Sequence, residues 1–239
     1  MSRSRKRVAG PAVAFLLFLA TPPALAHHGK DFLLAESCDL PHRGDLYLVA
    51  TADSVRDGGE SEEEVSPALL VGIAPRFAVE LHGHLGKVGG EGWRYEATAP
   101  SLHIRLTSPR SEAPWSLGLS VEREIANRND ENDRAEARLI ATRKDTRASL
   151  TLNLIGEREE GGGGASKLSY AAGLRPGLGH RFGWGLEAKG RIEHDAAHEV
   201  LVGFYSEPTE ELTLKIGLGT GLGPGGFDLT VRTGLVWRF

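Results

Sequence analysis

The sequence contains one cysteine, Cys38, so it can form no intramolecular disulfide. After the stretch Val8 to Ala20, no apolar run approaches the ~20 residues that a membrane-spanning helix requires. The net charge of -4 is too small to indicate a nucleic-acid partner. Leu34 to Ser37, which precede Cys38, follow no apolar segment, and this argues against lipid attachment there. Two classes remain for a secreted chain, a soluble periplasmic protein or a closed barrel, because an open sheet cannot leave its edges unpaired in lipid.

The amino terminus has the three parts of a secretory signal peptide. A basic region, Arg3 to Arg7, precedes the apolar stretch, and Ala24-Leu25-Ala26 forms a small-x-small cleavage site. A membrane anchor is the alternative, but the apolar stretch is short for one. We predict a signal peptide over residues 1–26, an amino-terminal segment over 27–43 and a β-barrel over 44–239.

From residue 44 onward, apolar and polar residues alternate in segments of about ten residues, as the strands of membrane barrels do. Glycine is also abundant, at 31 of 239 residues, and barrels use glycine at bends and close approaches. The sequence therefore predicts an all-β fold, a transmembrane antiparallel up-and-down barrel of about twelve strands. The expected segments are Asp45 to Val55, Pro67 to Ala74, Arg76 to Leu85, Arg94 to Thr107, Pro114 to Ile125, Asp133 to Arg143, Arg147 to Glu157, Lys167 to Leu174, Arg181 to Glu193, His198 to Tyr205, Glu211 to Gly219 and Gly226 to Phe239.

Two of these segments are irregular. The alternation within 94–107 shifts by one around Pro100, which predicts a β-bulge. Residues 133–143 could also form one face of a helix. A soluble sandwich would alternate as well, but Trp115, Trp184, Trp237 and Phe239 fall at segment ends on the apolar face, as membrane-interface girdles require.

The last segment has one apolar face that begins and ends with aromatic residues. That face carries Phe227, Leu229, Val231, Leu235, Trp237 and Phe239. A strand that ends on an aromatic residue at the chain terminus resembles the carboxyl-terminal assembly signal of Gram-negative outer-membrane barrels. The resemblance implies the outer membrane as location, its lipid and lipopolysaccharide as surroundings, and the barrel-assembly machinery as a partner that binds the Phe239 strand. We expect a monomer.

The connections alternate in length if both chain ends lie in the periplasm, although Thr107 to Pro114 is longer than this rule prefers. Ala74 to Arg76 and Lys144 to Thr146 are tight turns, expected on the periplasmic side. The acidic run Glu60 to Glu64 is expected to be a solvated external loop. The other longer connections, also expected outside, are Gly86 to Gly92, Ala126 to Asn132, Arg158 to Ala165, His194 to Ala197 and Gly221 to Gly225.

The polar faces of the segments are expected to line the lumen. The candidate lumen residues are Glu80, His82, His84, His103, Arg105, Glu122, Arg138, Glu187, Lys189, Arg191, Lys215 and Arg232. Such mixed charges could select a solute, or they could pair across strands and seal the interior. The first interpretation predicts a channel for small organic solutes, and the second a structural or accessory envelope barrel. Residues 27–43 could fold into the periplasmic mouth as a plug.

A metal-handling barrel is a third interpretation. His82 and His84 share one strand face, and His103 lies on the next segment, so the three imidazoles could bind a transition metal. His27 and His28 would form the mature amino terminus and could chelate copper. No cofactor is expected. No enzyme is expected either, because Ser116, Ser120 and Ser149 have no histidine in the same register to act as a base.

The hairpin Leu70 to Leu81 is similar to the signature of a family of outer-membrane transporters assigned to the meta-pathway of phenol degradation. Gly72, Arg76 and Phe77 fit the motif, whereas Pro75 replaces its usual acidic turn residue. The resemblance implies a barrel that takes up small organic solutes, and it transfers no binding residues to this chain.

Overall fold

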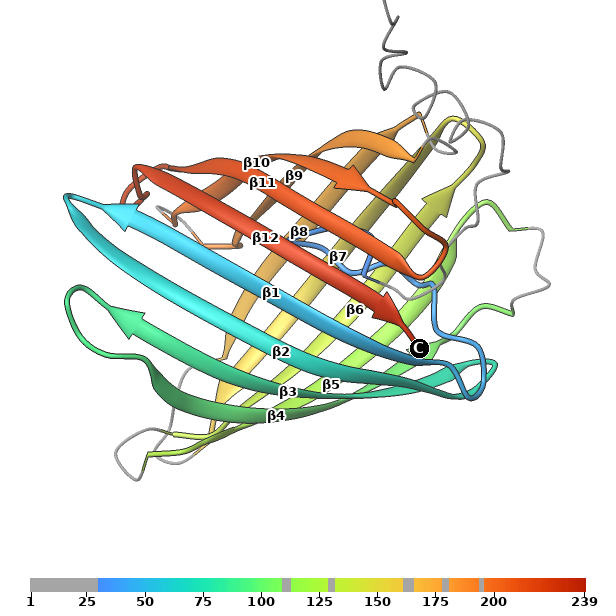
Figure 1. Cartoon of the computed structure of the whole chain (residues 1–239), viewed down its shortest axis with the longest axis horizontal. Coiled ribbons are helices and arrows are strands. Elements are labelled where there is room, and N and C mark those ends of the chain that lie inside the picture. The colour runs from blue at the N-terminus through green and yellow to red at the C-terminus, as the bar shows by residue number, and fades with distance from the viewer. Residues whose placement is uncertain (1–29, 109–112, 129–131, 161–165, 178–180, 194–195) are drawn as a thin grey trace, which may run out of the picture.

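The computed structural model describes residues 30–108, 113–128, 132–160, 166–177, 181–193 and 196–239. These form a closed barrel of twelve strands, each antiparallel to its neighbours in the chain, with β1 and β12 paired (Figure 1). The predicted fold class is confirmed, while the signal peptide and residues 27–28 lie outside the described residues. The strands are β1 Leu46–Asp57, β2 Glu60–Ala74, β3 Phe77–Val88, β4 Arg94–Arg105, β5 Ser116–Ala126, β6 Arg134–Lys144, β7 Ala148–Glu159, β8 Lys167–Pro176, β9 Phe182–Arg191, β10 His198–Ser206, β11 Leu212–Leu222 and β12 Leu229–Arg238.

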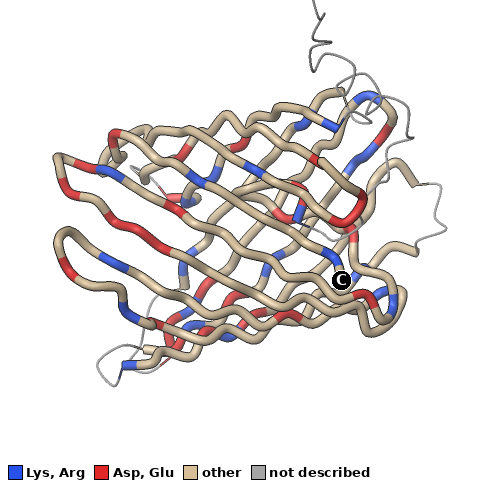
Figure 2. The backbone as a smooth tube through the Cα atoms, in the orientation of Figure 1, with Lys and Arg blue, Asp and Glu red and all other residues tan. Residues whose placement is uncertain are grey.

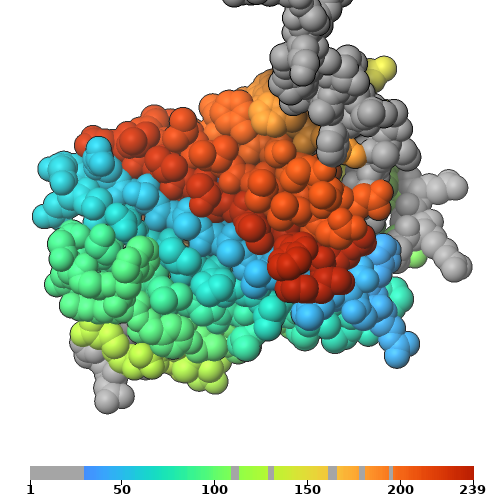
Figure 3. Space-filling model, in the orientation of Figure 1, coloured from blue at the N-terminus to red at the C-terminus, as the bar shows by residue number. Residues whose placement is uncertain are grey.

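Large apolar side chains cover the outside of the barrel. Leu81, Leu139 and Leu218 are each about half exposed, and small or polar residues alternate with such positions on the inside. The first and last strands pair from Tyr47–Arg238 to Arg56–Leu229, so the wall is continuous where they meet (Figure 3). A closed sheet with an apolar outer face satisfies the backbone within a bilayer. No helix in the described part of the chain is long and apolar enough to span a membrane.

Several local expectations need correction, and the first concerns the β-bulge. The bulge in β4 lies at Glu96, between the pairs His84–Ala97 and Leu85–Tyr95, and Pro100 pairs regularly with Leu81. Gly86 explains this position, because the Glu96 side chain lies where a β-carbon of residue 86 would be. Residues 134–144 form a strand and no helix, because β5 and β7 pair with them along their length.

The second correction concerns the acidic run. Glu60 to Glu64 belong to β2 and pair with β1, and only Gly58 and Gly59 connect the two strands. Both glycines have a positive φ, 55° and 94°, which allows this tight hairpin. In Figure 2 the acidic residues accordingly follow the β1–β2 hairpin itself.

The third correction concerns Phe227, and the loop lengths keep the exception that the sequence already shows. The connection at 106–115 is the longest, yet it lies at the barrel end that holds the carboxyl terminus (Figure 1). The alternation of loop lengths therefore holds only in part. Phe227 precedes β12, and it lines a cavity at the opposite barrel end rather than the apolar outer face.

Residues 30–41 run through the interior of the barrel and then reach β1 (Figure 1). Phe32 and Ala35 form a buried cluster with Ile155 and Ala171. Leu40 packs against a second cluster that the walls supply at the other end of the segment. The interior is thus filled by a piece of the same chain.

Candidate functional site in the barrel lumen

All twelve predicted lumen residues lie on the strand faces opposite the exposed apolar side chains. On β9, for example, Glu187, Lys189 and Arg191 lie on the face opposite Trp184 and Leu186, which are about half exposed. The period of two places them there, because successive side chains of a strand point to opposite faces. Their degree of burial differs: Glu80, His103, Glu187, Lys215 and Arg232 are buried, while Arg191 is exposed at the end of β9.

Side chains of the wall accept hydrogen bonds from the backbone of the inner segment. The Leu33 and Leu34 amides donate to the Glu187 carboxylate, at 2.9 Å and 2.6 Å. The Glu36 amide donates to Asn153 Oδ1 at 2.8 Å, and the Cys38 amide donates to Thr142 Oγ1 at 3.0 Å. These bonds replace those that an irregular segment cannot make with itself.

Other wall side chains donate to the carbonyls of the same segment. Lys215 Nζ donates to the carbonyls of Lys30 and Phe32, at 3.0 Å and 2.7 Å. The Arg175 guanidinium donates to the Asp31 carbonyl at 3.1 Å. Side chains of β6 to β9 and of β11 therefore hold the backbone of the segment between residues 30 and 38.

An ion-pair cluster joins the segment to the wall. Lys30 Nζ lies 2.8 Å from both Glu36 Oε1 and Glu80 Oε2. Burial alone would lower the pKa of Lys30, but the two carboxylates outweigh it and raise that pKa above its ordinary value. Burial alone would likewise raise the pKa of Glu36, but Lys30 and Arg138 hold it well below its usual range. Both groups are thus charged at neutral pH.

The predicted histidines bind carboxylates. His103 Nε2 and His82 Nε2 lie 2.9 Å and 3.3 Å from Glu80 Oε2, and His84 Nδ1 lies 2.8 Å from Glu64 Oε1. The His82 ring stacks on the His84 ring, with centroids 6.1 Å apart. Within the described ranges, no three histidine, cysteine or acidic side chains are grouped as a metal would require. The structure thus does not assemble the expected imidazole centre, and His27 and His28 lie outside the described part.

Two serine–histidine contacts were not predicted from the sequence. Ser66 Oγ lies 3.1 Å from His84 Nδ1, and Ser101 Oγ lies 3.3 Å from His103 Nε2. In each case the carboxylate that is hydrogen-bonded to the ring contacts the same nitrogen as the serine. On the other nitrogen of His103, the Glu36 carboxylate lies 3.8 Å from Nδ1, which is too far for a hydrogen bond. A hydrolytic triad needs the base and its orienting carboxylate on different nitrogens. Neither arrangement has that geometry.

Other predicted residues form ion pairs and hydrogen bonds within the wall. Arg232 binds Glu199 through two nitrogens, at 2.8 Å and 3.0 Å, and also binds Asp53. Lys189 lies 3.4 Å from Glu199. Arg138 pairs with Glu136 at 2.9 Å, Glu122 lies 3.6 Å from His82, and Arg105 donates to Ser116 Oγ at 3.1 Å.

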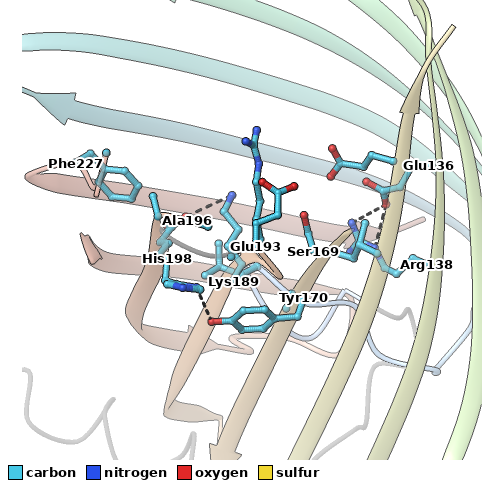
Figure 4. Close-up of a pocket in the computed structure, with 18 of the residues that line it drawn as sticks. Glu136, Arg138, Ser169, Tyr170, Lys189, Glu193, Ala196, His198 and Phe227 are labelled. Atoms are coloured by element: carbon cyan, nitrogen blue, oxygen red, sulfur yellow. Dashed lines mark hydrogen bonds and ion pairs between the residues drawn. The ribbon is translucent and has the colours of Figure 1, made fainter. Parts of the chain in front are cut away.

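A cavity of about 770 Å³ opens above the inner segment, at the barrel end away from the carboxyl terminus. We call this cavity the vestibule. Glu136 and Arg138 lie on one side of it, and Lys189, His198 and Phe227 lie on the other (Figure 4). Its lining also includes Glu157 and Arg191, and Leu34 of the inner segment. The vestibule is therefore polar and of mixed charge, and the inner segment lies beneath it.

Several residues of the site were not predicted. Asp53 and Glu199 share the polar parity of their strands, so the alternation that found Arg232 could also have found them. Lys30 and Glu36 gave no periodic signal, because they lie in an irregular segment. Their contact with Glu80 is set by the path of the chain in space.

Comparisons with known proteins concern the fold. No family model matches the sequence, and no curated protein matches it. An outer-membrane channel from Pseudomonas putida F1 superposes with a TM-score of 0.62 at 15% identity, covering 88% of this chain and 99% of that one. The KdgM and NanC porins each superpose with a TM-score of 0.56 at 9% identity, covering 81% of this chain and 99% and 100% of theirs. The chain therefore has the fold of outer-membrane porins and channels.

Proposed function

We propose that the protein is an outer-membrane channel for small organic solutes, with residues 30–41 as an internal plug. The main support is the architecture of the closed barrel. Its polar lumen opens into the vestibule at one end, and a segment of the same chain fills the lumen beneath it. The vestibule would admit a solute from outside, and the plug would set how far it passes. The fold shared with porins and channels supports this role.

The solute class is part of the proposal. Acidic and basic side chains both line the vestibule, so no single sign of charge is favoured. The hairpin that resembles the phenol-degradation transporters gives small aromatic or aliphatic solutes as the first class to examine. Metal handling by His27 and His28 is a subsidiary proposal, tested by titrating the purified mature protein with copper or zinc.

The partners follow from the same role. We expect a monomer in outer-membrane lipid and lipopolysaccharide, with both chain ends toward the periplasm and the Phe239 strand bound by the assembly machinery during insertion. Conductance of the purified protein does not depend on these partners, so the channel can be tested alone.

Liposome swelling with solutes of graded size, charge and aromaticity tests the proposal. We expect slow swelling with the full mature chain and faster, size-limited swelling after deletion of residues 27–41. A heat-induced shift in gel mobility checks that the shortened barrel is folded. If both folded forms are silent, the ion-paired interior marks an accessory barrel, and the channel proposal fails.

A further inference from the structure

The wall of the lumen recognises the inner segment mainly through its peptide backbone. Amides of residues 33, 34, 36 and 38 donate to wall side chains, and carbonyls of residues 30, 31, 32 and 36 accept from them. At residue 36 the recognition is two-sided, because Asn153 accepts from its amide and donates to its carbonyl, at 2.8 Å each. Side chains of the wall thus bind both the amides and the carbonyls of a bent peptide segment.

Glycines in the wall create pockets for the side chains of this peptide. A β-carbon at Gly173 would lie 2.4 Å from the Phe32 ring, and one at Gly217 would lie 2.7 Å from Leu33. The Phe32 ring also meets the Tyr205 ring edge-on, with centroids 6.4 Å apart. Absence of side chains at these wall positions is therefore what admits the apolar residues of the occupant.

Glu187 and Lys215 are only 3% and 6% exposed. Glu187 accepts hydrogen bonds from the backbone of the inner segment, and Lys215 donates to it. A buried charge without such partners is strongly unfavourable. The wall is thus built to hold a ligand that offers amide donors and carbonyl acceptors at peptide spacing.

We propose that the lumen between β6 and β11 is a peptide-binding site, which residues 30–38 occupy as a tethered ligand and which a free oligopeptide can enter in their place. The site lies below the vestibule, so a peptide would reach it from there. It goes beyond the proposed channel, since binding requires no passage. The tether opposes exchange, because a short linker holds its ligand at an effective concentration of about 1 mM or more.

Cys38 provides a direct readout. Its side chain is 2% exposed, and its thiol contacts the Ser116 carbonyl at 3.2 Å, so labelling requires the segment to leave the wall. We would use the full mature chain with Phe32→Ala, which weakens the occupant and leaves every strand unchanged. The probe is a synthetic peptide of residues 30–41 that carries Cys38→Ser.

The free peptide is expected to raise the Cys38 labelling rate saturably, by about tenfold at millimolar concentration. A scrambled peptide should have no effect. Gly173→Leu, added to the Phe32→Ala chain, should abolish the response by filling the aromatic pocket. Gly183→Leu is the matched control on the same face of the wall, because no atom lies within 4 Å of its β-carbon position.

If Phe32→Ala alone already exposes the Cys38 thiol, labelling can no longer report binding. Fluorescence anisotropy of the dye-labelled peptide then measures its binding directly. No saturable binding, an equal effect of the scrambled peptide, or indifference to Gly173→Leu overturns the proposal. Bilayer conductance of the same protein tests the channel separately. A conducting barrel that binds no peptide would contradict the peptide site alone. A barrel that binds peptide but does not conduct would contradict the channel alone.

Discussion

Two single residues show how this barrel is held together: Gly72 leaves room for a close backbone approach, and Arg232 pairs with buried carboxylates. A β-carbon at Gly72 would lie 2.0 Å from the His42 carbonyl oxygen. The Gly72 amide also donates to the Asp45 carbonyl, and its own carbonyl accepts from Gly44. The glycine of the family-like hairpin therefore fixes where the inner segment leaves the lumen and enters β1.

Gly72→Ala is expected to loosen the inner segment. The added methyl must displace the chain at residues 41–42, and overpacking of this kind costs about 1–3 kcal/mol. Faster labelling of Cys38 and a lower unfolding midpoint would show it. Gly183→Ala is the control, since its β-carbon has open space; equal behaviour of the two variants would contradict the close approach.

Arg232 neutralises two carboxylates of the lumen wall, those of Glu199 and Asp53. Arg232→Met leaves the Glu199 carboxylate, 3% exposed, without its main partner, together with Asp53. We expect a loss of up to about 3–5 kcal/mol in the free energy of unfolding, because the buried Glu199 carboxylate then keeps only Lys189, 3.4 Å away, as a cationic partner. Urea unfolding in detergent, followed by tryptophan fluorescence, measures it.

The control for Arg232 is an exposed arginine. Arg123 lies 3.2 Å from Asp133 and 2.7 Å from Glu160, and all three side chains are at least 30% exposed. Arg123→Met should therefore change the stability by about 0–1 kcal/mol. A similar loss in both variants would argue against the special role of burial at Arg232.

At the scale of elements, the inner segment is the part whose position depends on titration. The pKa of Glu36 is depressed, so its ion pairs contribute fully above the unfolded value near 4.5 and lose strength as the pH falls below it. The pKa of Lys30 is raised, so its contribution is full below the unfolded value of 10.5 and is lost only as the pH rises past it. The segment is held most firmly between these limits.

We expect acid to release the inner segment. Labelling of Cys38 with a dithiodipyridine reagent, which reacts with thiols in acid, should be slow at neutral pH and should accelerate below about pH 4.5. Glu36→Gln should label faster at neutral pH and show a smaller increase in acid. An unchanged acid response in Glu36→Gln would mean that other groups hold the segment.

At the scale of the whole molecule, the outer surface of the barrel is suited to contact with lipid. Leu139 lies in the middle of β6, is 53% exposed, and pairs with Leu119 and Leu154 on its two sides. Its surroundings on the wall are therefore apolar in both directions. Only a bilayer or detergent makes such a surface favourable.

Leu139→Arg should cost about 2–4 kcal/mol when the barrel unfolds from lipid vesicles, as arginine does near the bilayer midplane. Ile125→Arg, at the end of β5, should cost about 0–1 kcal/mol because the interface is close. Denaturant titration in vesicles measures both. Equal costs, or a compact fold that survives without detergent, would contradict the membrane barrel.

The sequence by itself determined the barrel, its strand number and the faces of its strands. A period of two assigns every residue of a strand to lipid or lumen, and lipid requires the apolar face to be continuous. That is why the alternation alone places Glu187, Lys189 and Arg191 in the lumen and Leu139 on the outer face. The acidic run at 60–64 misled because charge resembles a loop, whereas β1 supplies a partner for each of its residues.

Only the tertiary structure decided what fills the lumen and which charges meet. Asp53 reaches Arg232 because the barrel closes, and Lys30 reaches Glu80 because an irregular segment turns inward. No local pattern encodes such contacts, since the partners are far apart in the chain and the occupant has no period. The faces of the strands could be predicted from the sequence because lipid requires an apolar face of each strand separately. The contacts in the interior could not, because they depend on the positions of all the strands together.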